Sequence, residues 1–198
     1  MFVLMSQPLK IILCGPPGSG KDTHATVLSA TFGIPSISMG GMLREEIVRQ
    51  TADGATAAQY MQRGEMVPQE IVDRLLKQKL ASESCANGYI LNGYARAMDS
   101  LKTYLAIDQP THVIHLMLSD DDVQDRLKVR GRHDDQAHVI EVRLKRYHAD
   151  EVQVAEFWKN DPSVWYKEIW TNRAPIDITK DIIDFMHASM HMQNRFTK

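Results

Sequence analysis

A glycine-rich segment near the amino terminus has the residue types and the spacing of a phosphate-binding loop. It reads Gly-Pro-Pro-Gly-Ser-Gly-Lys from Gly15 to Lys21. Glycines allow successive backbone N–H groups to curl around one anion, and the final lysine of such a loop reaches the β- and γ-phosphates of a nucleotide. The candidate ATP-binding residues of this segment are Gly15, Pro16, Pro17, Gly18, Ser19, Gly20, Lys21, Asp22 and Thr23.

A plain Gly/Pro turn between a strand and a helix has a similar composition, so the flanking segments must separate the two interpretations. The apolar run 10–14 is stopped by Gly15 and is typical of a fully buried strand in a parallel sheet. A helix is predicted over 20–32, ended by Gly33 and Pro35. Its positive end would point at the loop. This context favours a phosphate loop over a simple turn.

The rest of the chain alternates strand-like and helical segments. Further strands are predicted at 88–92, 111–118 and 165–171, and helices at 41–51, 68–81, 120–128 and 136–158. Such alternation predicts right-handed βαβ crossovers and an α/β fold around a parallel sheet. Ligands bind beyond the carboxyl ends of the strands in these sheets, so the ends after Cys14 and Asn92 mark the expected site.

Length and composition place the chain among soluble globular proteins of one domain. It has 198 residues, of which 43% are hydrophobic and 24% charged. A formal net charge of −2 argues against a protein that coats nucleic acid. Neither the scattered histidines nor the two cysteines have metal-ligand spacing.

The two cysteines and the amino-terminal segment bear on location. Cys14 and Cys85 are too few for a disulfide framework and fit a reducing compartment. The apolar stretch at residues 1–5 is interrupted by Pro8 and Lys10, before a signal peptide or a membrane span could form. We therefore expect a cytoplasmic protein that binds neither membrane nor nucleic acid.

Several segments match the motifs of one protein family, in the family's order. The loop follows the pattern Gly-x-Pro-Gly-x-Gly-Lys-Gly-Thr except at Asp22. Residues 38–44 read Ser-Met-Gly-Gly-Met-Leu-Arg, 64–72 read Gly-Glu-Met-Val-Pro-Gln-Glu-Ile-Val, and 88–96 read Gly-Tyr-Ile-Leu-Asn-Gly-Tyr-Ala-Arg. On these residues the chain resembles the adenylate kinase and nucleoside monophosphate kinase family.

The resemblance implies a fold and a domain organisation. The fold would be a three-layer P-loop kinase fold, with a central parallel sheet flanked by helices. One domain would span 1–198, with an acceptor-binding lobe at 38–68 and a reduced lid at 130–136. Arg132 and Arg143 are eleven residues apart, which is the family's spacing. The matches extend from residue 10 to about residue 147.

The resemblance also implies a reaction, the in-line transfer of a phosphoryl group from ATP-Mg²⁺ to a nucleoside monophosphate, with AMP the favoured acceptor. Such a protein positions two anions and neutralises their charge, a task for which guanidinium groups are suited. Arg44 and Arg96 would hold the acceptor, and Arg132 and Arg143 would close on the transferring group. The implied catalytic residues are Lys21, Arg96, Arg132 and Arg143.

The remaining implied contacts divide between donor and acceptor. Arg126 would stack on the donor base and Arg130 would assist at the lid. The backbone of residues 64–67 would border the acceptor base. The implied acceptor-binding residues are Met39, Gly40, Arg44, Gly64, Glu65, Met66, Val67, Gly93, Arg96 and Ser100.

Two departures from the family pattern concern the metal site. The family has an aspartate where this chain has Asn92, and the strict loop pattern has Ser or Thr where this chain has Asp22. We hypothesise a swap in which Asp22 orders the Mg²⁺ waters with Thr23 and Asn92. The alternative is that Asp22 only stabilises the start of its helix. An uncompensated Asn92 would leave a catalytically weakened nucleotide-binding protein.

Other departures concern the acceptor base and the lid. Ser100 falls where adenylate kinases have a base-reading glutamine, so a UMP/CMP-type kinase stays open as an alternative. Only Gly131 separates Arg130 from Arg132, and the lid lacks the cysteines of a zinc site, so no zinc is expected. Poorer exclusion of water predicts some ATP hydrolysis without acceptor. We expect a monomer that binds small nucleotides.

Overall fold

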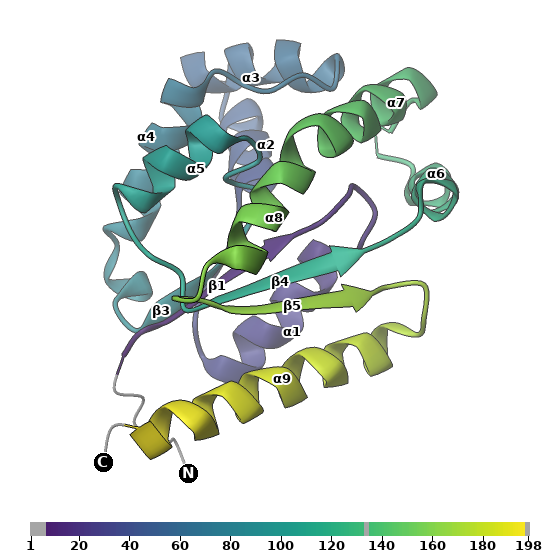
Figure 1. The fold of residues 1–198 in the computed structure, drawn as a ribbon. Helices are drawn as coiled ribbons and strands as arrows, with labels where there is room; N and C mark the ends of the chain where they lie inside the picture. Colours follow the sequence, from purple (N-terminus) through teal and green to yellow (C-terminus); the bar gives the residue numbers. More distant parts are fainter. Residues whose placement is uncertain (1–6, 133–134, 197–198) are drawn as a thin grey trace.

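Five parallel strands form the centre of the molecule (Figure 1). The structure is a computed structural model that describes residues 7–132 and 135–196. In the order β2-β3-β1-β4-β5, the sheet confirms the strands expected at 10–14, 88–92, 111–118 and 165–171 and adds the short β2. The strands are β1 (Leu9–Cys14), β2 (Ser36–Ser38), β3 (Gly88–Asn92), β4 (His112–Met117) and β5 (Trp165–Trp170).

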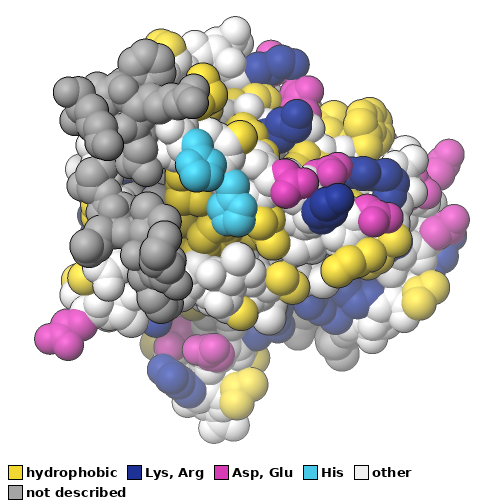
Figure 2. Space-filling view, turned by 90° about the horizontal axis from the view of Figure 1, so that it is seen from below, with side chains coloured by type: hydrophobic (Ala, Val, Ile, Leu, Met, Phe, Trp, Pro, Cys, Tyr) yellow, Lys and Arg dark blue, Asp and Glu magenta, His cyan; other side chains and the backbone are white. Residues whose placement is uncertain are grey.

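One face of the sheet is covered by α1 (Lys21–Phe32) and α9 (Pro175–Phe196). Leu28 of α1 and Ile182 of α9 are fully buried against strand residues such as Ile11. Seen from the side of these helices, acidic and basic side chains are intermingled on the surface (Figure 2).

The other face is covered by α4 (Gln69–Leu80), α5 (Met98–Leu105) and α8 (Val152–Asn160). Trp158 and Tyr104 are fully buried in this second core. A 3₁₀ turn, Glu83–Cys85, precedes β3. Two helical layers with a parallel sheet between them confirm the expected three-layer α/β fold.

Two groups of helices begin where the strands end. Directly after β2 come α2 (Met39–Val48) and α3 (Ala52–Gln62), within the expected acceptor lobe at 38–68. They pack closely, since a Cβ on Gly54 would lie 2.1 Å from the carbonyl oxygen of Glu46.

After β4 come α6 (Asp120–Arg130), α7 (Ala137–Arg146) and a π-helical segment, Tyr147–Glu151, that continues into α8. Of the expected lid at 130–136, residues 133–134 lie outside the described residues. Within the described ranges, no helix combines the length and the apolar character needed to cross a membrane.

Candidate active site

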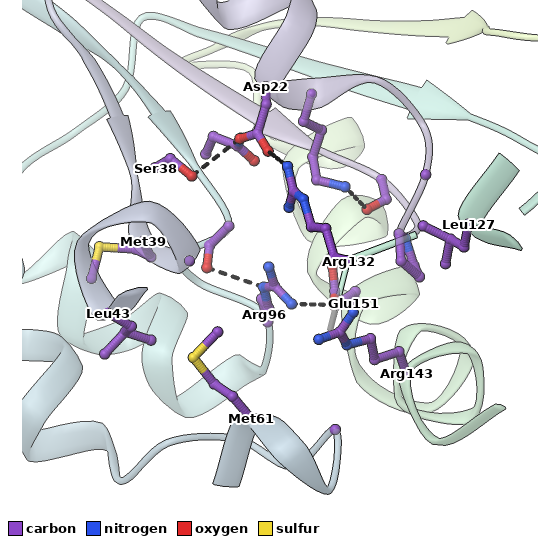
Figure 3. A pocket seen from close by; sticks show the side chains of 18 of the residues that line it. Asp22, Ser38, Met39, Leu43, Met61, Arg96, Leu127, Arg132, Arg143 and Glu151 are labelled. Carbon is purple, nitrogen blue, oxygen red and sulfur yellow. Dashed lines mark hydrogen bonds and ion pairs between the residues drawn. The ribbon is translucent and has the colours of Figure 1, made fainter. Parts of the chain in front are cut away.

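A cavity of about 310 Å³ lies between the phosphate loop, the α2–α3 lobe and the ends of α6 and α7 (Figure 3). Most of the predicted site residues line it together. Those are Gly15, Pro17, Gly18, Gly20, Lys21, Asp22, Thr23, Met39, Gly40, Arg44, Gly64, Glu65, Met66, Val67, Asn92, Gly93, Arg96, Arg126, Arg130, Arg132 and Arg143. The structure does not bring three of the predicted residues to its wall: Pro16, Ser19 and Ser100.

The loop holds its lysine over its own backbone. Lys21 Nζ donates to the carbonyl oxygens of Gly15 and Pro16, each at 2.7 Å, and to Ser19 Oγ at 3.3 Å. Gly15 has φ +136°, and a Cβ there would lie 2.2 Å from the carbonyl oxygen of Leu116, so no other residue fits. Burial lowers the pKa of Lys21 to about 8. The ammonium group thus lies at the loop, where it can donate hydrogen bonds to the phosphate of a bound nucleotide.

Asp22 and Asn92 are in direct contact. Asn92 Nδ2 donates to Asp22 Oδ1 at 2.6 Å, and Ser38 Oγ donates to the same oxygen at 3.1 Å. Arg132 Nη2 donates to Asp22 Oδ2 at 3.4 Å. Burial raises the pKa of Asp22, but the Ser38 hydrogen bond and the Arg132 charge outweigh it and leave the pKa below its ordinary value. An ionised carboxylate therefore stands beside the loop.

Two arginine side chains, Arg130 and Arg143, donate to one carboxylate. Asp135, whose side chain is 1% exposed, accepts from Arg130 Nε at 2.7 Å and from Arg143 Nη1 at 3.4 Å. It also accepts from the backbone N–H of Arg132 at 3.1 Å. A glycine, Gly131, ends α6 in a left-handed conformation, which turns the chain back toward this carboxylate.

Two further arginines are fixed by backbone carbonyls. Arg126 donates to the carbonyl oxygens of Gly18, at 3.3 Å, and Thr171, so it lies beside the phosphate loop. Arg96 Nε donates to the carbonyl oxygen of Gly93 at 3.0 Å. Both guanidinium groups are thereby oriented before any phosphate binds.

Apolar side chains form one wall of the cavity. These side chains are Met39, Leu43, Met61 and Val72.

Ser100 does not line the cavity, and its hydroxyl has another role. Its Oγ accepts from the backbone N–H of Ala97 at 3.1 Å and donates to the carbonyl oxygen of Ala97 at 2.8 Å. Its hydroxyl therefore stabilises the start of α5.

Two charged residues in the cavity wall were not predicted. Arg146 lies three residues after Arg143 on α7, a spacing that places both on one helix face and could have revealed it. Glu151 lies 3.7 Å from Arg96 Nη1 and ends the π-helical segment. No sequence pattern announces a π-helical turn, so Glu151 carried no such signal.

No group of three or more His, Cys, Asp or Glu residues within the described part of the chain is arranged to hold a metal ion. Asp22, Thr23 and Asn92 carry side-chain oxygen atoms, and all three line the cavity. A hard cation that keeps several of its waters needs only one or two such groups.

Comparisons with known proteins agree with this site. The family model for adenylate kinase matches residues 13–163. An adenylate kinase from Mycolicibacterium smegmatis is 37% identical over 158 residues, which are 77% of this chain and 87% of the relative. One from Rhodococcus erythropolis is 35% identical over 157 residues, with the same coverage of 77% and 87%. One from Leptospira biflexa is 34% identical over 159 residues, 76% of this chain and 86% of the relative.

These matches confirm the sequence-based interpretation of the chain as a nucleoside monophosphate kinase, a phosphotransferase whose acceptor is a phosphate group. The matched region runs from the end of β1 to the turn before β5 and contains the phosphate loop, the α2–α3 lobe and all of the arginines discussed above. The chain belongs to the adenylate kinase family.

Proposed function

We propose that this protein transfers the γ-phosphoryl group of ATP-Mg²⁺ to AMP in the cavity beside the phosphate loop. The observation that carries the proposal is the convergence of Lys21 with Arg44, Arg96, Arg132 and Arg143 on one cavity of about 310 Å³. Phosphoryl transfer between two nucleotides requires two highly charged anions to be held in line. Cations supplied from both sides of one cavity meet that requirement.

In this proposal the cavity has a donor half and an acceptor half. Lys21 and the loop backbone bind the ATP phosphates, and Arg126 lies beside them for the donor base. The segment 38–68 acts as the acceptor lobe, with Arg44 and Arg96 on the acceptor phosphate. Arg132 and Arg143 stabilise the charge of the transferring group, and the segment 130–136 serves as a reduced lid.

Mg²⁺ enters this site as part of the ATP substrate. Its chemistry is to neutralise charge on the β- and γ-phosphate oxygens. Asp22 fits the task of orienting its waters, because the carboxylate is ionised and, among the described residues, its Oδ2 accepts one long hydrogen bond, from Arg132 at 3.4 Å. Thr23 and Asn92 supply the neighbouring oxygens. The contact between Asp22 and Asn92 supports the swap of metal-ordering roles.

One observation favours a second candidate, a kinase for UMP or CMP. Ser100, the predicted base-reading residue, hydrogen-bonds within α5 and does not line the cavity. Base selection then falls to the backbone of 64–67 and to the apolar wall. The third candidate, a catalytically weakened binding protein, rests on Asn92 and on the short lid.

The cellular setting is also a proposal. A monomer in the cytoplasm, acting in nucleotide biosynthesis, would suit the two free cysteines, Cys14 and Cys85. The net charge of −2 favours small-molecule substrates over nucleic acid.

A coupled assay tests the proposed function. ATP is supplied with AMP, CMP, UMP or GMP in turn, with and without Mg²⁺, and formation of the diphosphate is followed. We expect the fastest turnover with AMP, dependence on Mg²⁺, and loss of turnover in Lys21→Met. A preference for UMP or CMP would establish the second candidate. No turnover with any monophosphate would refute the kinase and leave the binding protein.

A further inference from the structure

Arg146 is a partly buried cation in the cavity wall to which the proposed mechanism gives no role. It ends α7, and it shares the cavity with Arg143, one turn earlier. Lys145, between them, faces away from the cavity: its side chain is 75% exposed and pairs with Glu141 at 2.7 Å. The side chains of Arg143 and Arg146 therefore lie on the cavity side of α7, and that of Lys145 lies on its solvent side.

One edge of the Arg146 guanidinium is fixed and another is left open. Nη1 donates to the carbonyl oxygen of Gly64 at 2.7 Å. Nε is buried and has no hydrogen-bond partner among the described residues. A buried N–H group without a partner is unfavourable, and its cost is removed when a ligand supplies an acceptor.

The charges around Arg146 are unbalanced. Burial and the nearby Arg96 and Arg143 lower its pKa to about 10, so it stays cationic at neutral pH. Glu151 and Asp150 oppose this positive charge, and Glu151 lies 3.7 Å from Arg96 Nη1 (Figure 3). Arg143 is paired with Asp135 at 3.4 Å. Among the residues that line the cavity, eight lysine and arginine side chains face three carboxylates, those of Asp22, Glu65 and Glu151. A phosphomonoester dianion would offset part of this positive charge.

We propose that Arg146 is a further acceptor-binding residue, which holds the phosphate of the nucleoside monophosphate together with Arg96 and Arg143. The proposal rests on the proposed function, since it assigns this cavity to a monophosphate. The Nε side of the guanidinium would supply the phosphate contact, because Nη1 is held by Gly64. The same side chain would thus connect the base-bordering segment 64–67 to the phosphate.

A purely structural role would give a different result in one measurement. If Arg146 only fastens the Gly64 segment to α7, its loss weakens the binding of AMP and of adenosine alike. If Arg146 holds the phosphate, its loss weakens the binding of AMP and leaves adenosine unchanged. Comparison of the nucleotide with its nucleoside therefore separates the two roles.

The experiment is a calorimetric titration of the full-length protein with AMP and with adenosine, without ATP. The variants are Arg146→Met, which removes the donors, and Arg146→Lys, which keeps the charge but not the fork; Lys145→Met is the matched control. We expect Arg146→Met to weaken AMP binding about ten- to a hundredfold, as for lost charge-assisted hydrogen bonds. Arg146→Lys should be intermediate, and Lys145→Met should equal the wild type.

Equal loss of AMP and adenosine affinity, or AMP affinity within twofold of the wild type in Arg146→Met, overturns the proposal. So does a wild-type protein that does not bind AMP. A kinase assay of the wild type is run in parallel: if the wild type phosphorylates AMP and Arg146→Met binds AMP normally, only the role of Arg146 is wrong. If the wild type is inactive, the proposed function fails, and the titration still decides the role of Arg146.

Discussion

The side-chain amide of Asn92 donates to the carboxylate of Asp22, with 2.6 Å between Nδ2 and Oδ1. Two carboxylates at this distance could not both stay ionised, because like charges raise one of the two pKa values. An amide at 92 removes that repulsion and leaves Asp22 charged. The identities of the two residues are therefore coupled, and neither substitution of the family pattern is understood without the other.

This coupling predicts a non-additive double-mutant cycle. Asp22→Gly removes the carboxylate and Asn92→Asp places a second one beside the first, so each single change should lower kcat with ATP-Mg²⁺ and AMP about tenfold or more. The double variant Asp22→Gly/Asn92→Asp restores one carboxylate and should recover most of the activity. Steady-state kinetics over a range of Mg²⁺ concentrations checks this. Additive losses would contradict the swap.

Lys21 predicts a pH dependence of ATP binding. Burial lowers its pKa to about 8 in the free protein, and a bound triphosphate favours the charged form and raises it again. ATP binding must then take up a proton, so affinity should fall as the pH rises above about 8, by up to about tenfold per unit.

Calorimetry at pH 8 in two buffers of different ionisation enthalpy measures that proton uptake directly. Lys21→Met is the matched variant and should show weak ATP binding without this pH dependence. Affinity that stays constant between about pH 7 and pH 9 would show that Lys21 is already fully charged in the free protein.

We expect that substitution of Ser100 changes the stability of the protein but not its specificity for the acceptor. Its Oγ makes both of its hydrogen bonds to the backbone of Ala97. Ser100→Ala should lower the free energy of unfolding by about 1 kcal/mol and leave the KM for AMP unchanged. Denaturant unfolding and the coupled assay measure the two quantities. A change in the ratio of kcat/KM between AMP and CMP would mean that Ser100 does contribute to recognition of the acceptor base.

His115 predicts a loss of stability in acid. Its ring contacts the hydroxyls of Tyr147 and Tyr166, at 2.8 and 3.0 Å, and burial lowers its pKa from 6.5 to about 4. In the unfolded chain His115 becomes protonated below about pH 6.5, whereas in the folded chain it stays neutral down to about pH 4. Stability should fall through this window by about 1.4 kcal/mol per pH unit for this group.

His115→Gln keeps hydrogen-bonding capacity without a titrating group. Thermal unfolding between about pH 7 and pH 5 should show a smaller pH dependence for this variant than for the wild type. His112, whose pKa burial lowers to about 4, and His24, whose pKa burial also lowers, contribute to the dependence that remains. An unchanged dependence in His115→Gln would mean that the His115 pKa is not shifted.

The sequence predicts the elements whose residues have a strong period or a strong stop signal. The strands at 10–14 and 88–92 are continuous apolar runs ended by glycine, and both lie where expected. The strand β2 has three residues, too few for any pattern. The helix α9 was not predicted as an element, although Ile178, Ile182 and Met186 recur every four residues and are buried.

The candidate site divides in the same way. Residues within motifs, such as Lys21 and Arg96, were found because their spacing is local. Ser100 was assigned by position in a motif, but position does not reveal that its hydroxyl would hydrogen-bond to Ala97. Glu151 reaches the cavity through a π-helical turn, which shifts the following side chains and leaves no trace in residue spacing.

The buried carboxylate of Asp135 accepts hydrogen bonds from the guanidinium groups of Arg130 and Arg143. A long flap must give up the freedom of many backbone dihedrals when it closes, about 1–2 kcal/mol for each residue that becomes ordered. If the segment 130–136 is the reduced lid that we propose, its closure would consist mainly of an exchange of partners, in which the guanidinium groups of Arg130 and Arg143 leave Asp135 for a phosphate. The entropy of ordering a flap is then small, and the strength of ion pairs governs the step. Added salt, which weakens such pairs, should therefore affect this enzyme's turnover more than solvent viscosity does.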